Sequence, residues 1–342
     1  MAEQKDTPTP PPFAVMARLL DGFQVSQALF AIADLGVPTI LDQEGPTPLA
    51  VLAERTAANP DALRRLVRSL APLGVFTTDG DQVSITPLGA TLSENHPHSL
   101  LGVARAGMQF HYLPFTELRH TLRTGQPAAD KYYGMPYFDW LAADPARSRL
   151  FSQAMATFAT TLRAGIFDGY RLPRGKTIAD IGGSDGTMLA RLLDHDDDPA
   201  RRGIVLDLPA TIQAARTSPT ATELADRLEF VAGDFFTAVP TADIYLLGWI
   251  LHDWSDQDAL RVLGSISAAA NPGARVIILE GIVPPGDQPH PTKALDLAML
   301  GILGGKERTE QEYRDLLESA GFTLDRVLDT PSPYAILEAT LR

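Results

Sequence analysis

His252 is the side chain of this 342-residue protein that is best suited to accept a proton during a reaction. It lies in WILHDWSD (residues 249–256), directly after the apolar run DIYLLG. Glu280 ends the next apolar run, RVIILE, and Glu307 follows a Gly-Gly turn in ILGGKERTE. A lone histidine is more often structural than catalytic. Two carboxylates that can orient its ring reverse that expectation, because a histidine that acts as a base is generally held in this way.

A glycine-rich loop, DIGGSDG (residues 180–186), is suited to hold a ligand. It lies between the strand-like run TIA and the helical run MLARLL. Glycines let the backbone approach a ligand closely, and a helix N-terminus favours negative or polar groups. No lysine follows the last glycine, which excludes a P-loop, and the glycine spacing differs from that of the dinucleotide fingerprint. Taken alone, the loop is a weak indication of the ligand.

Aspartates at the ends of three successive strand-like runs narrow the choice of ligand. They are Asp180, Asp207 in GIVLDLP and Asp234 in VAGDFF. Ligands of open α/β sheets bind at the carboxyl ends of the strands, so we expect these acids to share one site. Each alone is better explained as a turn or cap residue. Together they predict a site in which Asp207 binds ribose hydroxyls and Phe235 lies on a base.

The same acids favour a cationic ligand. A pyrophosphate would be repelled by Asp180, and no basic residue near the loop would compensate. A sulfonium cofactor carries a positive charge and an ammonium group, and carboxylates beside it are favourable. The sequence therefore predicts S-adenosylmethionine as the cofactor.

A phenolic acceptor would explain why the reaction needs a base. With a pKa near 10, only about one phenol in a thousand is ionised at pH 7. Recovering that factor is worth roughly 4 kcal/mol, which a positioned general base can supply. The remaining acceleration must come from the alignment of oxygen, methyl and sulfur.

The second part of the chain supplies the elements that position these residues. Short apolar runs alternate there with helical stretches, which predicts a parallel sheet with helices on both faces. The predicted strands are TIADI, GIVLD, LEFVA, DIYLLG and RVIILE, followed by FTLDRVLDT and YAILEATLR as two adjacent strands. The predicted fold class is α/β, with a Rossmann-like, doubly wound domain over residues 166–342.

The first part, residues 13–165, has a helical pattern and follows an expected disordered tail at residues 1–12. FAVMARLLDGFQVSQALFAIADLGV is apolar on every side, and such a helix is usually buried. In a small domain a second copy of the chain can bury it, so we expect a homodimer through these helices. Residues 47–92 predict two helices and a hairpin at Asp79-Gly80, which is the winged-helix pattern.

Composition and charge exclude several classes of protein. The sequence has no cysteine, so it has no disulfide, thiolate zinc site or cysteine nucleophile. No run approaches the length of a membrane span, and the polar, proline-rich start lacks the features of a signal peptide, so we expect a cytoplasmic protein. The net charge of −13 argues against a nucleic-acid partner. A ligand-sensing DNA-binding regulator remains an alternative because Arg64, Arg65 and Arg68 lie on the second helix of the winged-helix pattern.

DHDDDP (residues 194–199) could be imagined as a metal site. It lies on the helix-to-strand side of the predicted domain, away from the ligand-binding end of the sheet. Consecutive acids also cannot all face one ion, so a solvated loop is the better interpretation. We expect no metal site and a reaction that needs no metal ion.

The chain as a whole resembles the small-molecule O-methyltransferases of the plant caffeic acid and hydroxyindole type, in their bacterial natural-product branch. The resemblance runs almost from end to end and rests on the order of DIGGSDG, VLDLP, GDFF, WILHDWSD, ILEGIVP and GGKERT. It implies a winged-helix-like dimerisation domain that is intertwined with its partner and forms part of the substrate pocket. It also implies that His252 is the general base and that Glu280 and Glu307 flank it.

The resemblance implies two further sets of residues. The cofactor set is Asp180, Gly182, Asp207, Leu208, Asp234, Phe235, Gly248 and Trp249. The substrate set is Phe151, Met155 and Phe158 in FSQAMATF, with Asp296 and Met299 in KALDLAML.

Two positions depart from the family pattern. Ser184 replaces the second spaced glycine of the loop, and Gly248 stands where plant members often carry a lysine. Some bacterial relatives that have lost the histidine catalyse hydroxylation or decarboxylation, so the presence of His252 favours methyl transfer. We expect a small aromatic metabolite of antibiotic or other secondary metabolism as the acceptor, with methylation at nitrogen or carbon as the alternative on the same fold.

Overall fold

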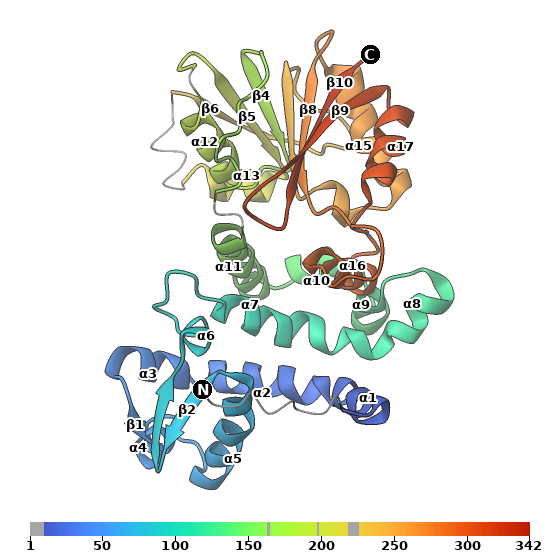
Figure 1. Ribbon diagram of the computed structural model, residues 1–342. Helices are drawn as coiled ribbons and strands as arrows, with labels where there is room; N and C mark the ends of the chain where they lie inside the picture. Colours follow the sequence, from blue (N-terminus) through green and yellow to red (C-terminus); the bar gives the residue numbers. More distant parts are fainter. Residues whose placement is uncertain (1–9, 163–164, 197, 218–225) are drawn as a thin grey trace, which may run out of the picture. The chain divides into compact units, whose positions relative to one another are not determined.

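The computed structural model describes residues 10–162, 165–196, 198–217 and 226–342 (Figure 1). Residues 1–9 of the expected tail, Asp197 of the acidic cluster and the side chain of Phe158 lie outside this description. The chain forms two compact units, of which the first comprises Met1–Leu113 and Leu141–Thr161 and the second comprises Pro114–Trp140 and Leu162–Arg342. Residues 114–140 thus belong to the second unit, because their helices pack against a helix of that unit, Pro291–Ile302.

Short helices and a small antiparallel sheet build the first unit. Its helical segments are α1 (Pro12–Leu20), α2 (Gly22–Asp34), α3 (Val37–Glu44), α4 (Leu49–Arg55), α5 (Pro60–Leu70), η1 (Ala71–Leu73), α6 (Pro87–Ala90), α7 (Leu101–Ala106), the π-helix η2 (Gly107–Tyr112) and α11 (Pro145–Leu162). The sheet has the order β1-β3-β2, with β1 (Thr47–Pro48), β2 (Phe76–Asp79) and β3 (Gln82–Ile85). Two helices and a hairpin therefore occur in the predicted order.

Helix α5 shows how the sequence sets these elements. The side chain of Asn59 accepts a hydrogen bond of 3.0 Å from the backbone N–H of Ala62, so it satisfies one of the free donors at the helix start. Apolar residues three and four positions apart then face one side of the helix. The buried face consists of Leu63, Val67 and Leu70.

The first helices expose a row of large apolar side chains. Helix α1 has no buried residue at all. The exposed side chains on α1 and the start of α2 are Phe13, Met16, Leu19, Leu20 and Phe23. Within the described residues, no single helix is long and apolar enough to cross a membrane, and α2 and α3 meet that test only as a bent pair.

A seven-stranded sheet forms the centre of the second unit. Its order is β6-β5-β4-β7-β8-β10-β9, with β4 (Thr177–Ile181), β5 (Arg202–Asp207), β6 (Leu228–Ala232), β7 (Ile244–Gly248), β8 (Arg275–Glu280), β9 (Phe322–Asp329) and β10 (Ala335–Leu341). Strands β4 to β8 are parallel, and β10 runs antiparallel to both β8 and β9. All seven predicted strands are confirmed. The strand order reverses between β4 and β7, which is where open α/β sheets bind their ligands.

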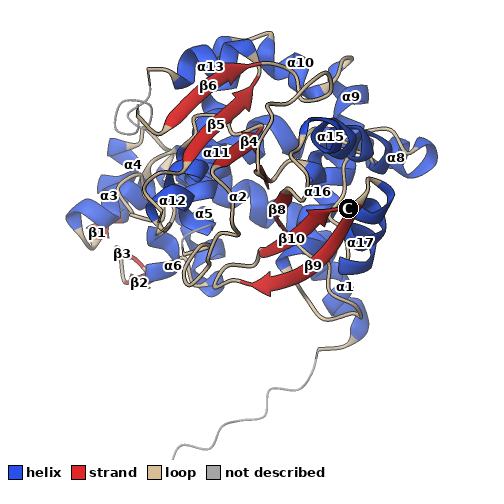
Figure 2. Cartoon of the chain, turned by 90° about the horizontal axis from the view of Figure 1, so that it is seen from above, coloured by secondary structure: helices blue, strands red, loops and turns tan. Residues whose placement is uncertain are grey.

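Helices cover both faces of this sheet. They include α12 (Thr187–Asp194), α13 (Pro209–Ala215), α15 (Asp256–Ala269) and α17 (Glu310–Ser319). The further helical segments are η3 (Pro114–Glu117), α8 (Leu118–Thr124), α9 (Ala128–Tyr133), α10 (Tyr137–Ala142), η4 (Leu251–Asp253) and α16 (Pro291–Ile302), and α16 packs against η3, α8 and α9. Figure 2 shows α15 and α17 on one side of the sheet and α12 on the other. Alternate strand residues such as Ile181, Leu247 and Ile278 pack with Leu263 of α15 and Leu317 of α17 in one buried core.

The acidic cluster at residues 194–199 is only partly exposed to solvent, whereas a fully solvated loop was expected. Asp194 and Asp198 are exposed, as expected of a solvated loop. The side chain of Asp196 is only 8% exposed and forms an ion pair of 3.0 Å with Arg201, which is also buried. Burial of one carboxylate is possible here because the guanidinium compensates its charge.

Removal of the Asn59 side chain tests the local rule that starts α5. We expect Asn59→Ala to lower the free energy of unfolding by about 1 kcal/mol, the usual cost of a lost N-cap. Ser69→Ala, at an exposed position of the same helix, is the matched control and should change it by less than about 0.5 kcal/mol. Urea unfolding followed by circular dichroism measures both. Equal effects would show that the cap contributes nothing.

Candidate active site

The glycine loop after β4 wraps around Asp180 and contacts the loop after β7. A Cβ on Gly183 would lie 2.5 Å from Asp180 Cγ, so no side chain fits there. Gly182 has a φ of +72°, and a Cβ on it would lie 2.5 Å from Ile250 Cδ1. Glycine is required at both positions because the backbone must approach its neighbours closely. The predicted cofactor loop and the loop that carries His252 therefore touch.

Asp207 ties the loop after β5 to the glycine loop. Its Oδ2 accepts the N–H of Ser184 at 2.9 Å, and its Oδ1 accepts the N–H of Leu208 at 2.7 Å. Ser184 has a φ of +53°, a conformation that glycine adopts without strain. An ionised carboxylate has about four acceptor positions, so Asp207 keeps capacity for a ligand's hydroxyl groups. The side chain of Leu208 is exposed.

Asp180 is a buried acid with one oxygen unused. It is 2% exposed, and its Oδ2 has no hydrogen-bond partner in the structure. Burial, followed by the charges of Asp207 and Asp185, raises the pKa of its carboxyl to about 8. A buried polar atom without a partner is costly. A cationic ligand with N–H donors would relieve both the charge repulsion and the missing hydrogen bond, so S-adenosylmethionine fits this group of residues.

Two aromatic rings lie at the loop after β6. Asp234 Oδ1 accepts the N–H of Phe236 at 2.8 Å, which fixes this turn. The Phe235 ring packs edge-on against Trp254, with 6.1 Å between the ring centroids. A Cβ on Gly182 would lie 3.6 Å from Phe235, so the ring borders the glycine loop. Sequence reasoning missed Trp254, although it stands two residues after His252.

Trp249 occupies a strained position directly after Gly248, the last residue of β7. Its φ is +57°, which is unusual for a bulky side chain. The ring is 6% exposed and packs edge-on against Tyr334, with 5.0 Å between the centroids. The resemblance places Trp249 in the cofactor set, and the structure shows that its ring is engaged in packing within the unit.

His252 and Glu307 form a buried pair. His252 Nδ1 and Glu307 Oε1 are 2.6 Å apart, and the two residues are 8% and 3% exposed. A carboxylate can only accept, so Nδ1 carries a proton and donates it to Glu307. The other ring nitrogen, Nε2, lies 3.4 Å from Asp253 Oδ1. The backbone N–H of Glu307 in turn donates to Asp296 Oδ1 at 3.0 Å, which fixes the glutamate.

Glu280 holds the loop that carries His252 and makes no hydrogen bond to its ring. Its Oε1 accepts the backbone N–H groups of Ile250 and His252, each at 3.1 Å. Its Oε2 accepts the hydroxyl of Tyr313 in α17. The expectation that Glu280 orients the imidazole is corrected in this respect, because both of its oxygens are engaged by other donors, the backbone of the loop and the hydroxyl of Tyr313. The sequence carried no signal for Tyr313, which lies 33 residues from Glu280.

The carboxylates around His252 strengthen it as a base. Burial lowers the pKa of His252, but the carboxylates of Asp253, Glu307 and Glu280 outweigh burial and raise the pKa to about 9. At pH 7 the ring is therefore an imidazolium, and about one molecule in a hundred has the neutral ring. Sequence reasoning did not include Asp253 among these acids.

The predicted substrate residues lie on helices of different units. Asp296 and Met299 belong to α16 in the second unit, and Asp296 is engaged with Glu307 as described above. Phe151 and Met155 lie half-buried on α11 in the first unit. Their roles stay predictions.

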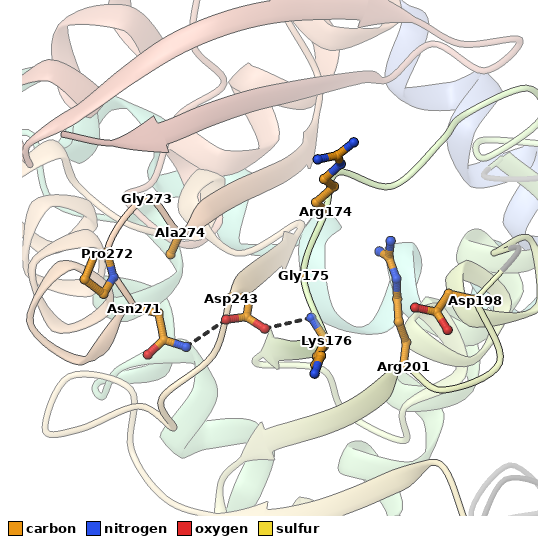
Figure 3. A pocket seen from close by; sticks show the side chains of 10 residues that line it. All are labelled: Arg174, Gly175, Lys176, Asp198, Arg201, Asp243, Asn271, Pro272, Gly273 and Ala274. Carbon is orange, nitrogen blue, oxygen red and sulfur yellow. Dashed lines mark hydrogen bonds between the residues drawn. The ribbon is translucent and has the colours of Figure 1, made fainter.

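A cavity lies at the other end of the sheet (Figure 3). Its volume is about 530 Å³, and it is lined by residues that precede β4, β5, β7 and β8, among them Lys176, Arg201 and Asn271. Asp243 spans its floor by accepting hydrogen bonds from the side chain of Asn271 and the backbone of Lys176. None of the predicted site residues lines it. In the described part of the chain, no group of three or more histidine, aspartate or glutamate residues is arranged to hold a metal ion.

Comparisons with known proteins show the family of the chain. The family model of the O-methyltransferase domain matches residues 115–323, and that of the O-methyltransferase dimerisation domain matches residues 17–95. The phenazine O-methyltransferase PhzM of Lysobacter antibioticus is 35% identical over 341 residues, which cover 99% of each chain. The 8-amino-8-demethylriboflavin N,N-dimethyltransferase of Streptomyces davaonensis is 32% identical, covering 92% of this chain and 91% of its own.

A solved structure links the fold to a bound cofactor. The O-methyltransferase NcsB1 from neocarzinostatin biosynthesis, in complex with S-adenosylmethionine and 2-hydroxy-5-methyl naphthoic acid, matches with a TM-score of 0.80 and 32% identity, covering 93% of this chain and 96% of its own. The chain is thus an S-adenosylmethionine-dependent methyltransferase, and it belongs to the O-methyltransferase family of antibiotic biosynthesis.

Proposed function

We propose that this enzyme methylates a phenolic hydroxyl of a small aromatic metabolite and that His252 is the general base. One observation carries the proposal. The loop that carries His252, whose ring pairs with the buried Glu307, also contacts the glycine loop, through Ile250 and Gly182. A base beside a cofactor loop at the switch point of the sheet is what deprotonation and methyl transfer require.

The residues proposed to hold the cofactor divide its binding among them. Asp180 would bind its cationic part, Asp207 the ribose hydroxyls, and Phe235 the base. Gly182 would allow close approach of the backbone, and Trp254 is a new candidate for contact with the base because it packs on Phe235. When bound, S-adenosylmethionine supplies an electrophilic methyl group on a cationic sulfur.

The proton of the acceptor would pass to Nε2 of His252. Nδ1 stays engaged with Glu307, so Nε2 is the atom that exchanges a proton with the substrate. His252 loses its own proton more readily when another positive charge is close, because like charges disfavour the charged form. Asp296 and Met299, with Phe151, Met155 and Phe158, stay candidates for contact with the aromatic acceptor.

Methylation at nitrogen is the second candidate, since one relative is an N,N-dimethyltransferase. An aromatic amine is largely neutral at pH 7 and needs no base before it attacks. The need for His252 therefore separates the two reactions. The regulator alternative finds little support in the charge of α5, because Arg64 forms an ion pair of 2.8 Å with Asp81.

We further propose that two copies of the chain cover the apolar row on α1 and α2. The dimerisation-domain match begins at residue 17 and so includes Leu19, Leu20 and Phe23. Exposed apolar patches of this kind mark interfaces.

The assembly proposal predicts a dimer that charge on α1 disrupts. Light scattering at micromolar concentration should give twice the chain mass for the wild type. Leu19→Glu/Leu20→Glu should shift the mass toward the monomer, because buried charges oppose association. Arg65→Glu, at an exposed position of α5, is the control and should stay dimeric. A monomeric wild type would overturn the proposal.

The cofactor proposal predicts that Asp207→Ala weakens S-adenosylmethionine binding. The expected loss is about 1.5–3 kcal/mol, the range for hydrogen bonds to a charged group. Calorimetric titration measures it. Asp198→Ala, an exposed aspartate at the opposite end of the sheet, is the matched control and should bind normally. Unchanged affinity in Asp207→Ala would show that ribose is bound elsewhere.

The base proposal predicts a pH-dependent defect in His252→Ala. Turnover of a phenolic acceptor, such as a hydroxynaphthoic acid, should fall by about 10²–10⁴-fold with cofactor affinity retained. The defect should shrink as pH approaches the pKa of the phenol, because solvent then supplies phenolate. Added chelator should leave the wild-type rate unchanged. A defect that stays constant up to high pH would assign His252 a positioning role instead.

Glu307→Gln is the second arm of the same experiment. The Glu307 carboxylate raises the pKa of His252, so its removal lowers that pKa. Activity that depends on the neutral ring should then begin to rise at lower pH than in the wild type, while maximal turnover falls because the ring is less well oriented. A rising limb that does not move would contradict the coupling of the pair.

A further inference from the structure

We propose that Arg308 is a positioning residue that sets the place of the proposed base by holding the backbone on both sides of His252. The inference rests on the proposed function of His252. It concerns a residue that follows Glu307 directly in the GGKERT segment and that the sequence patterns did not single out.

The guanidinium of Arg308 spans the loop after β7. Its Nη1 donates to the carbonyl of Leu251 at 2.8 Å, and its Nη2 donates to the carbonyl of Trp254 at 3.0 Å. Its Nε donates to Asp256 Oδ1 at 2.9 Å, at the start of α15. The two carbonyls enclose His252 and Asp253. One planar side chain thus fixes the segment before and after the histidine.

Arg308 is fully buried, which makes this use of a cation costly unless its donors are engaged. Each of its three nitrogens has a partner on the loop or on the start of α15. The planar guanidinium can donate to two carbonyls at once from separate nitrogens, whereas an ammonium carries all its donors on one nitrogen. A lysine would therefore keep the charge and lose the two-sided grip.

The backbone of the same segment is packed against the loop. A Cβ on Gly305 would lie far inside the van der Waals contact distance of the carbonyl oxygen of His252, so only glycine fits there. The carbonyl of Arg308 accepts the N–H of Val283 at 2.9 Å, which anchors the segment to the chain that continues from β8. This one anchored segment therefore holds the ring of His252 through Glu307 and the backbone on both sides of His252 through Arg308.

Lys306 offers a matched control within this stretch. Its Nζ pairs with Asp256 Oδ2 at 2.9 Å and with Glu312 Oε1 at 3.0 Å. It thus shares Asp256 with Arg308, but no hydrogen bond to the carbonyls of Leu251 or Trp254 is among its contacts. Its side chain is 35% exposed. If loss of positive charge near Asp256 alone affects turnover, Lys306→Met should show that effect. If the hydrogen bonds of Arg308 to the two carbonyls are what matters, Lys306→Met should not show it.

The experiment compares Arg308→Lys, Lys306→Met and wild type in the full-length enzyme. We expect Arg308→Lys to lower kcat by about 10–100-fold, because small displacements of a catalytic group have effects of this size. The KM for the acceptor and the Kd for S-adenosylmethionine should stay within about threefold, since neither contact is altered. Lys306→Met should leave all three values unchanged.

Two further readouts distinguish positioning from general structural damage. In the His252→Ala background, Arg308→Lys should cause no further loss, because residues that act through one another are non-additive. The far-downfield proton resonance of the His252–Glu307 hydrogen bond, identified by its absence in His252→Ala, should shift or broaden in Arg308→Lys and stay in place in Lys306→Met. An additive loss or an unmoved resonance would overturn the proposal.

The resonance is independent of the role of His252 in catalysis. If His252→Ala retains full turnover while the resonance still responds to Arg308→Lys, the proposed base is wrong and the grip of Arg308 stands. If Arg308→Lys does not fold, Asp256→Ala removes the partner of Arg308 Nε without adding atoms to the loop, and it should lower kcat and change the resonance in the same direction. Lys306→Met, which loses its own ion pair with Asp256, remains the control. A normal resonance and normal kcat in Asp256→Ala would then overturn the proposal.

Discussion

The burial of Glu280 is the constraint on which the site depends. This carboxylate is fully buried at the end of β8, and an ionised group there is stable only with donors around it. Two backbone N–H groups of the loop after β7 and the hydroxyl of Tyr313 supply them. The loop cannot leave its conformation without uncovering a buried charge. Trp249, directly before this anchored stretch, keeps its strained φ.

The cofactor end of the site has the opposite property, because its charges are not balanced within the protein. Burial and the charges of Asp207 and Asp185 disfavour the ionised form of Asp180, which also keeps an unused oxygen. Such an arrangement lowers the stability of the free enzyme, and a cationic ligand restores it by binding only the folded state. The anchored loop and the unbalanced loop meet at Ile250 and Gly182. The rigid part of the site thus borders the part that ligand binding completes.

Much of this site follows from the sequence, and the remainder has a physical reason for escaping it. The ends of parallel strands meet at one edge of a sheet, so the acids that follow β4, β5 and β6 were expected together, as were His252 and Glu307. Glu280 was expected to contact the imidazole of His252. A sequence pattern shows which residue ends a strand, but it does not show which donor that residue's side chain reaches. Arg308 and Tyr313 act across 33 to 57 residues of sequence without any local periodicity. The placement of residues 114–140 depends likewise on packing against α16, a contact between distant segments.

The high pKa of His252, the proposed base, suits catalysis only when the cofactor is bound. A general base works best with a pKa near the operating pH, and the pKa of His252 is about 9 in the free enzyme. At pH 7 the neutral, proton-accepting form of His252 is then only about one hundredth of the total. The greater proton affinity of a stronger base recovers only part of that loss in rate. The three carboxylates that raise the pKa would therefore hinder catalysis if they acted on His252 alone. A second cation in the site would offset part of the effect of these carboxylates and would lower the pKa of His252 toward neutrality. The acids that prepare the site for a cationic cofactor and the acids that hold the histidine are in this sense parts of one charge balance.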